Sequence, residues 1–259
     1  MVATCNVNIP PNRKYKKCVD KKFMGGHKNA FINHYSEGVV YCGKLLNNKE
    51  KQFYNYLSTR PEIKRFFPNF YGLCKKNKND YMIIENVFMK LKPDYKFVDL
   101  KIGHRTAYSI DSGIIKNKKH NIMDKYLSTT SKEGFRIEGL NFKINNKFVN
   151  SKIKRHSINP TNLWKSLLIN SSTKLIDKLL SNLKKIINML YKNLFNKNKF
   201  ALIGTSILIA HDNNNVIVKL IDFSHPFFGS NDFNDALAED MYFSVLNLYQ
   251  SLLYFLEIN

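Results

Sequence analysis

The sequence predicts an α+β fold with two lobes. Short strand candidates fill the N-terminal part of the chain, whereas the two longest helix signals lie at 173–195 and 235–256, with a strand hairpin between them. Strands followed by mixed helices and a hairpin are the order typical of α+β proteins. The chain has 259 residues, of which 44% are hydrophobic. That is enough to bury a core around a cleft between two lobes.

The chain divides into three expected parts. Residues 1–22 are polar and basic and contain Pro10-Pro11, which indicates a loose N-terminal arm. We expect an N-terminal lobe over 23–88 and a C-terminal lobe over 89–259.

The N-terminal lobe has two strand candidates and one helix candidate. Strands are predicted at 39–42 and 81–87 because these segments are short and rich in β-branched and apolar residues. A helix is predicted over 47–57, with Asn47 or Asn48 as its N-cap. Its apolar residues follow a helical spacing: Phe53, Tyr56 and Leu57.

The first half of the C-terminal lobe alternates strands with a polar segment. Residues 97–103 alternate apolar and charged side chains, which is typical of a half-buried strand. A lysine-rich stretch follows, with a short helix predicted near 121–127. Residues 134–148 are interpreted as a pair of strands that turns at Asn145-Asn146.

The second half of this lobe carries the strongest periodicity. Over 173–195 the leucines and isoleucines form one apolar stripe and lysines occupy the other face, which predicts an amphipathic helix. Strands are predicted at 202–210 and 216–222, joined by a turn at 212–215. A last amphipathic helix is predicted over 235–256.

The charge balance indicates an anionic partner. Lys and Arg number 41 against 20 Asp and Glu, a formal net charge of +21. Nucleic acid, anionic lipid and small polyphosphates are the partner classes that such an excess favours. Because 35 of the 41 cations are Lys, AT-rich codon usage is an alternative source of part of this charge.

The cysteines and the termini indicate an intracellular location. The four cysteines form no C-x-x-C pair and have no histidine at zinc spacing. A disulfide framework is not expected in a chain of this length, which favours a reducing compartment. The N-terminus lacks the apolar core of a signal peptide, and no apolar run reaches the length of a membrane span. We expect a monomer in the cytoplasm or the nucleus, without a transmembrane segment.

Two residues on the predicted strand 97–103 could carry chemistry. Asp99 and Lys101 are two residues apart, so both side chains leave the same face of the strand. A carboxylate beside an ammonium group can accept a proton from an alcohol and stabilise an anion. An ion pair at the edge of a sheet is the structural alternative.

Three further positions suit the handling of phosphates. Asp222 ends an apolar strand, where it would either hold a metal ion or cap a turn. Lys44 follows the strand 39–42 and precedes the helix with Glu50, which would orient it toward nucleotide phosphates. A solvated lysine is the alternative. Gly25-Gly26-His27 would approach phosphates through its backbone or form a simple turn.

Several catalytic classes have no motif here. The chain contains no GxxxxGK[ST] loop, no G-x-S-x-G and no H-E-x-x-H. The lysines of the helix 173–195 either face water or form a basic surface for phosphates.

Six segments, taken in order, resemble the inositol polyphosphate kinase family. Any one match is weak, whereas six in the same order are specific and cover the chain from about residue 23 to its end. They are Lys44-Leu45-Leu46-Asn47-Asn48-Lys49-Glu50-Lys51-Gln52-Phe53-Tyr54, Ile84-Glu85-Asn86-Val87, Asp99-Leu100-Lys101-Ile102-Gly103 with Arg105-Thr106, Thr130-Ser131 with Gly134-Phe135-Arg136-Ile137-Glu138-Gly139, Gly204-Thr205-Ser206-Ile207-Leu208, and Ile221-Asp222-Phe223-Ser224-His225.

Two positions depart from the family pattern. Tyr95 stands where the motif before Asp99 has proline, with Pro93 the nearest proline. The segment Glu239-Asp240-Met241 lacks the glycine of a C-terminal motif, and we assign it no role.

The resemblance implies a bilobal, protein-kinase-like fold with ATP in the cleft, and an active kinase that uses ATP and Mg²⁺. By this resemblance, Lys44 would bind the phosphates of ATP, and the backbone of Glu85 and Val87 would bind its adenine ring. Asp99 would orient the substrate hydroxyl, and it would also contact ATP. Lys101 would bind substrate phosphate and stabilise the transferring group. Asp222 would bind the metal, with Ser206 beside it.

The resemblance also places a substrate-binding insert near 104–133. That insert is short, as in the multikinase and hexakisphosphate kinase branches, whereas the Gly134–Gly139 segment is closest to the trisphosphate 3-kinases. These two features do not decide to which branch of the family the chain is most similar. The expected substrate is a soluble inositol polyphosphate, held by basic side chains: Lys101, Arg105, Lys116, Lys118 and Lys119.

Two other functions compete with the kinase. A basic nucleic-acid-binding protein would explain the charge, but the chain lacks an RNP-like strand, a helix-turn-helix pattern and zinc ligands. We therefore expect only non-specific binding to nucleic acid. A kinase-fold binding module without catalysis is the third hypothesis.

Overall fold

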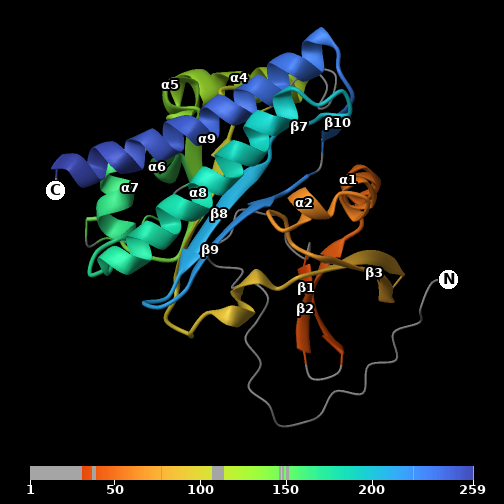
Figure 1. The fold of residues 1–259 in the computed structure, drawn as a ribbon, viewed down its shortest axis with the longest axis horizontal. Helices are drawn as coiled ribbons and strands as arrows, with labels where there is room; N and C mark the ends of the chain where they lie inside the picture. The colour runs from red at the N-terminus through yellow and green to blue at the C-terminus, as the bar shows by residue number, and fades with distance from the viewer. Residues whose placement is uncertain are drawn as a thin grey trace.

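Two four-stranded antiparallel sheets dominate the computed structural model, in which both halves of the chain supply strands and the long helices come from the second half (Figure 1). The structure describes residues 31–36, 39–76, 78–106, 114–145, 147, 149, 152–223 and 225–258. The expected arm 1–22 and the Gly25-Gly26-His27 segment lie outside these residues.

The N-terminal sheet has the strand order β1-β2-β4-β3. Its strands are β1 (Phe31–Ser36), β2 (Val39–Leu45), β3 (Phe70–Lys76) and β4 (Asn79–Ile84). Helices α1 (Asn48–Ser58) and α2 (Pro61–Lys64) connect β2 to β3. The Asn47 side chain accepts hydrogen bonds from the amides of Lys49 and Glu50, which confirms the predicted N-cap of α1.

The C-terminal sheet has the order β6-β5-β8-β9. Its strands are β5 (Lys96–Ile102), β6 (Phe135–Leu140), β8 (Ser206–His211) and β9 (Val216–Ile221). One face of β5 contributes Val98 and Leu100 to the main core, together with buried residues of the long helices. The other face carries Phe97, which packs against Leu208 in a separate apolar cluster. Alternation therefore turns Asp99 and Lys101 away from the main core.

Helices cover the C-terminal sheet. The long pair α8 (Thr173–Leu194) and α9 (Asp232–Ile258) lies side by side across the sheet, with α7 (Pro160–Leu167) near its end (Figure 1). Short elements complete the chain: η1 (Val87–Lys90), α4 (Ile114–Tyr126), α5 (Thr130–Glu133), α6 (Lys152–His156), β7 (Phe200–Leu202) and β10 (Pro226–Phe228). Among the described helices, none combines the length and the apolar character that crossing a bilayer requires.

The two lobes share one aromatic core. Phe53 of α1 lies with its ring centroid 5.3 Å from that of Phe67, 5.3 Å from that of Phe200 and 4.9 Å from that of Phe223. All four rings are fully buried or nearly so. Because Phe200 and Phe223 belong to the C-terminal lobe, α1 is packed against both lobes at once.

Three predictions about the strands were wrong. The predicted strand 81–87 ends at Ile84, because the Asn86 side chain caps the 3-10 helix η1 through the amide of Phe88. The predicted strand 202–210 is two strands in different sheets, separated at Gly204, whose φ of +67° interrupts an extended chain.

The third error concerns 134–148. Among the described residues of this range, β6 is the one strand, and it pairs with β5, a long-range partner that local patterns do not reveal. The turn at Asn145 forms a single bridge between Ile144 and Lys147. The helix predicted near 121–127 is also longer, since α4 begins at Ile114.

We predict that Leu248→Ala lowers the free energy of unfolding by about 2–5 kcal/mol, because Leu248 is fully buried in α9 and its truncation leaves a cavity. Urea unfolding followed by circular dichroism measures this change. The control is Ile258→Ala on the same helix, where the side chain is 54% exposed. Equal losses of unfolding free energy in both variants would contradict the placement of Leu248 in the hydrophobic core.

Candidate active site

The ammonium group of Lys44 joins the two lobes. Its Nζ atom donates to Oε1 of Glu50 at 2.9 Å and to Oδ1 of Asp222 at 2.7 Å. Glu50 lies on α1, and Asp222 follows β9 in the other lobe. Burial would lower the pKa of Lys44, but the Asp222 and Glu50 carboxylates outweigh burial and raise this pKa well above its ordinary value. Lys44 lies within β2 itself, which extends past the predicted 39–42, and its pairing with Glu50 is the expected one.

Asp222 is held in an unusual backbone conformation. Its φ is +64°, in the left-handed region, which side chains other than Gly, Asn and Asp rarely adopt. The preceding carbonyl of Ile221 accepts a hydrogen bond from Oγ1 of Thr205 at 2.7 Å, and the following Phe223 is fully buried. Burial would raise the pKa of Asp222, yet Lys44 and Lys101 together hold this pKa below its ordinary value.

Asp99 is a buried carboxyl group near Asp222. It is 2% exposed, and its Oδ1 has no hydrogen-bond partner among the residues that the structure describes. Burial, followed by the negative charge of Asp222, raises the pKa of Asp99 to about 7, against the opposing effect of Lys101. Such a group changes its charge close to neutral pH.

The strand register brings the other candidates to this point. Lys101 of β5 stands opposite Ser206 of β8, which stands opposite Ile221 of β9, directly before Asp222. Ser206 is buried, and its side chain hydrogen-bonds that of Asp99, which opposes the effect of burial on the pKa of Asp99. The fold therefore gathers five of the predicted residues where the two lobes meet: Lys44, Asp99, Lys101, Ser206 and Asp222.

Glu85 and Val87 form the connection between the lobes. Oε2 of Glu85 accepts from the backbone amide of Asn69 at 3.1 Å and lies 3.8 Å from Nζ of Lys219. Val87 packs with Phe88 and Leu208 in the apolar cluster on the cleft side of the C-terminal sheet. The side chain of Glu85 thus binds the backbone of Asn69 and lies near Lys219, and apolar side chains line the connection.

The predicted substrate-binding cations lie on one segment. Arg105 is exposed, and its Nε donates to Oδ1 of Asn121 on α4 at 3.0 Å. Lys118 and Lys119 are exposed on the same helix. Lys116 belongs to α4, but its side chain lies outside the described part. No described hydrogen bond ties the Lys118 or Lys119 side chain to the protein.

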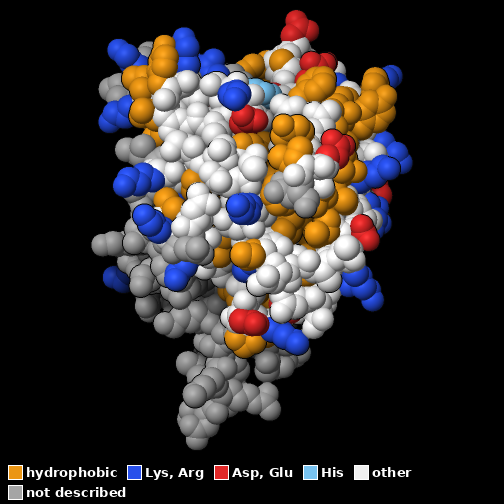
Figure 2. Space-filling model, turned by 90° about the vertical axis from the view of Figure 1, so that its left-hand side faces the viewer, with side chains coloured by type: hydrophobic (Ala, Val, Ile, Leu, Met, Phe, Trp, Pro, Cys, Tyr) orange, Lys and Arg blue, Asp and Glu red, His pale blue; other side chains and the backbone are white. Residues whose placement is uncertain are grey.

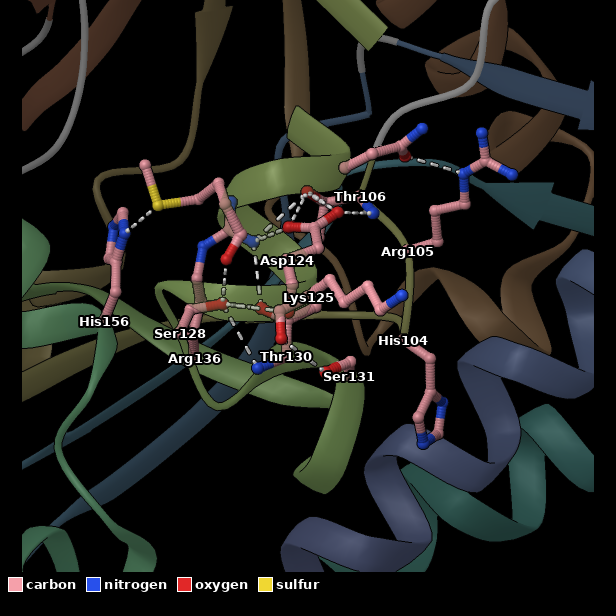
Figure 3. A network of polar contacts seen from close by, with 12 residues as sticks. His104, Arg105, Thr106, Asp124, Lys125, Ser128, Thr130, Ser131, Arg136 and His156 are labelled. Atoms are coloured by element: carbon pink, nitrogen blue, oxygen red, sulfur yellow. Dashed lines mark hydrogen bonds and ion pairs between the residues drawn. The ribbon is translucent and has the colours of Figure 1, made fainter. Parts of the chain in front are cut away.

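A buried network fixes α4 to the C-terminal sheet (Figure 3). Nη1 of Arg136 forms an ion pair with Asp124 of α4 and donates to Oγ1 of Thr130 at 2.9 Å. The backbone amide of Thr106 donates to Oδ2 of Asp124 at 2.7 Å. Arg136 stands opposite Lys101 in the β5–β6 register. The network therefore positions α4 relative to the strand that carries Asp99.

The same arginine reaches a second acid. Its Nη2 lies 2.9 Å from Oε1 of Glu138, whose Oε2 is 3.4 Å from Nε2 of His156 on α6. Sequence reasoning did not find this network, although Thr106, Thr130 and Arg136 all belong to the matched motifs. A buried arginine requires acidic partners, but Asp124 lies in a segment that none of the matched motifs covers.

A second contact missed by the sequence holds the loop after β5. Oδ1 of Asp240 on α9 lies 2.7 Å from Nδ1 of His104, and the backbone amide of His104 donates to the same atom at 2.9 Å. The Asp240 carboxylate raises the pKa of His104 against the effect of burial. Asp240 therefore positions the segment that leads to Arg105.

A bilobal fold with a Lys–Glu pair in the N-terminal lobe and an aspartate at the end of a C-terminal strand defines a protein-kinase-like protein. A comparison with protein families matches residues 81–253 to the family described as inositol polyphosphate kinase. That match covers more than half of the chain, so the chain belongs to the inositol polyphosphate kinase family.

A solved structure agrees with this assignment at the level of the fold. The chain is similar to inositol phosphate multikinase Ipk2 from S. cerevisiae, determined in complex with ADP and Mn²⁺. The TM-score is 0.65 at 18% identity, over 83% of this chain and 98% of the yeast chain. No curated protein matches the sequence.

We predict that Asp99 makes the protein less stable as the pH rises from about 4 to about 7. The folded-state pKa lies above the unfolded value of 3.8, so the folded state binds more protons in this window and ionisation there favours unfolding. Between pH 5 and pH 8, ionisation of Asp99 should lower the free energy of unfolding by about 2–4 kcal/mol.

Urea unfolding at both pH values measures this loss. Asp99→Asn should remove it, whereas Asp94→Asn, at an exposed position, should leave the wild-type difference in place. If Asp99→Asn keeps the full wild-type difference between pH 5 and pH 8, the carboxyl does not titrate near neutrality.

Proposed function

We propose that this protein is an ATP-dependent kinase that transfers the γ-phosphoryl group to a hydroxyl, or a phosphate, of a soluble inositol polyphosphate. The observation that carries the proposal is the arrangement of Lys44, with one carboxylate from each lobe within 2.9 Å of its ammonium group. Family membership supports the substrate class, and the yeast relative is described with bound ADP.

The nucleotide would lie between the lobes. Lys44 would bind its phosphates while Glu50 holds the ammonium group in position, as the Lys–Glu pair does in kinases. The adenine ring would contact the backbone of Glu85 and Val87 and rest against the apolar cluster that includes Leu208. Asp99 would also lie within reach of the phosphates.

The residues of the cleft fit a divalent cation such as Mg²⁺. Asp222 offers a partly exposed carboxylate, and Oδ1 of Asp99 has no hydrogen-bond partner in the described structure, with the side chain of Ser206 next to Asp99. No cluster of three or more His, Cys, Asp or Glu forms a metal site within the described ranges, so nucleotide phosphates and water would complete the shell. Bound Mg²⁺ would neutralise phosphate charge.

Asp99 and Lys101 would act on the acceptor. The Asp99 carboxylate would orient the substrate hydroxyl and accept its proton, and a pKa of about 7 suits this role at neutral pH. Lys101, on the same face of β5, would bind substrate phosphate and stabilise the transferring group. Phosphoryl transfer depends chiefly on such positioning and on cations.

The rim of the site would bind the remaining substrate phosphates. Arg105, Lys116, Lys118 and Lys119 lie on or next to α4, which the Arg136–Asp124 ion pair holds to the sheet. We propose the segment 104–133 as the substrate-binding insert, between an N-terminal lobe over 23–88 and the remainder of a C-terminal lobe over 89–259.

The overall charge gives less support to a nucleic-acid-binding function. Lys and Arg side chains on the face drawn in Figure 2 are spread over it rather than gathered in one stripe. Such a distribution favours weak, salt-dependent binding without sequence preference.

The kinase proposal predicts a new, more phosphorylated product when the protein is incubated with ATP, Mg²⁺ and inositol tris-, tetrakis-, pentakis- or hexakisphosphate. Anion-exchange chromatography or phosphorus NMR detects it. Asp222→Asn should lower the rate by about 10²–10³-fold or more, because the cation that would neutralise the phosphates loses its carboxylate ligand and Lys44 loses an ion-pair partner. Asp232→Asn, an exposed acid on α9, should keep wild-type activity. Turnover of none of the four substrates, with ATP still bound, would refute the proposal.

The proposed role of Asp99 also predicts a pH profile. Only the ionised carboxylate accepts a proton, so kcat/KM should rise with pH through an apparent pKa near 7. Initial rates at subsaturating substrate between pH 5 and pH 9 test this. A rise whose midpoint stays near 4 would rule out Asp99 as the group that limits the reaction.

A further inference from the structure

A cavity lies between the helices of the N-terminal lobe and α8, away from Lys44. Its volume is about 370 Å³, and it is lined by residues of α1, the α2 region and the C-terminal half of α8, together with Phe200. None of these residues belongs to the cleft around Lys44. The sequence had left open whether the lysines of this helix face only water or form a basic surface for phosphates.

Cations surround this cavity. Arg60 and Arg65 flank the short helix α2, and Lys185 and Lys192 are seven residues apart on α8, which places them two turns apart on one face. Glu62 is the one carboxylate among the lining residues. The cavity therefore carries a clear excess of positive charge contributed by both lobes.

The floor of the cavity is apolar and well packed. Phe66, Met189 and Phe200 are buried, and the guanidinium carbon of Arg60 lies 4.5 Å from the ring centroid of Tyr56. Nε of Arg60 is shielded from water and has no hydrogen-bond partner among the described residues. Because this Nε is closed to water, a phosphate would instead meet the outer nitrogens of the guanidinium group, which lines the cavity.

We propose that this cavity is a second binding site, specific for a small molecule that carries several phosphate groups. Its volume matches that of small-molecule sites. A nucleic acid would instead need a groove that follows its backbone. Cations placed around a pocket, with a preformed arginine held over an aromatic ring, suit several phosphates on one compact ligand.

Methyl NMR of methionine-labelled protein tests this site separately from the cleft. Sodium tripolyphosphate serves as the probe. The Met189 methyl group reports on the cavity, whereas Met82, opposite Lys44 in the β2–β4 register, reports on the cleft. The proposal expects a saturable shift of the Met189 signal, including when an unreactive ATP analogue already fills the cleft.

Matched variants identify the cations responsible. The double variant Lys185→Gln, Lys192→Gln should weaken binding at Met189 by about tenfold or more and leave the response of Met82 unchanged. The double variant Lys174→Gln, Lys184→Gln removes the same charge from exposed positions of the same helix and should have little effect. Thermal unfolding checks that all variants fold.

Two results would overturn the second site. One is a Met189 signal that does not move at concentrations that saturate the response of Met82. The other is equal weakening by both double variants, which would indicate diffuse attraction to a basic surface. Neither result depends on kinase activity, so this test is independent of the proposed function.

Discussion

The ion pairs of Lys44 govern the geometry of the cleft. A buried ammonium group needs carboxylate partners, and here one comes from α1 and the other from the end of β9. This single charge therefore fixes the distance between a helix of the N-terminal lobe and a strand end of the C-terminal lobe. The Lys44 charge also lowers the pKa of Asp222, so this carboxylate stays ionised. The pKa of the neighbouring Asp99 is instead raised to about 7. Two nearby acids thus have different protonation behaviour in one site.

The signature motifs combine chemistry with architecture. Asp99, Lys101 and Asp222 face the cleft, whereas Thr106, Thr130 and Arg136 meet inside a buried network and touch no part of it. These three residues tie the segment after β5, the helix α5 and the strand β6 to Asp124 of α4. A motif that looks catalytic in a sequence can therefore serve to hold a neighbouring helix, here α4, in place.

Local patterns predicted the parts of the fold that local physics determines. Asn47 caps α1, the leucine stripe forms α8, and alternation turns Asp99 and Lys101 to one face of β5. The pairing of β6 with β5, the break at Gly204 and the ion pair of Arg136 with Asp124 were not predicted, because each depends on contacts between distant segments. The strand β3 was also missed, since Phe70–Lys76 mixes glycine and lysine with its apolar residues.

The aromatic core shared by the lobes has a consequence for motion. Separating the lobes would expose Phe53, Phe67, Phe200 and Phe223, at a cost of about 1.5–3 kcal/mol for each ring. A state with fully parted lobes would thus be populated at less than about one part in ten thousand. A ligand that binds between the lobes would therefore enter and leave through small movements of side chains and loops, and not through a hinge that opens wide.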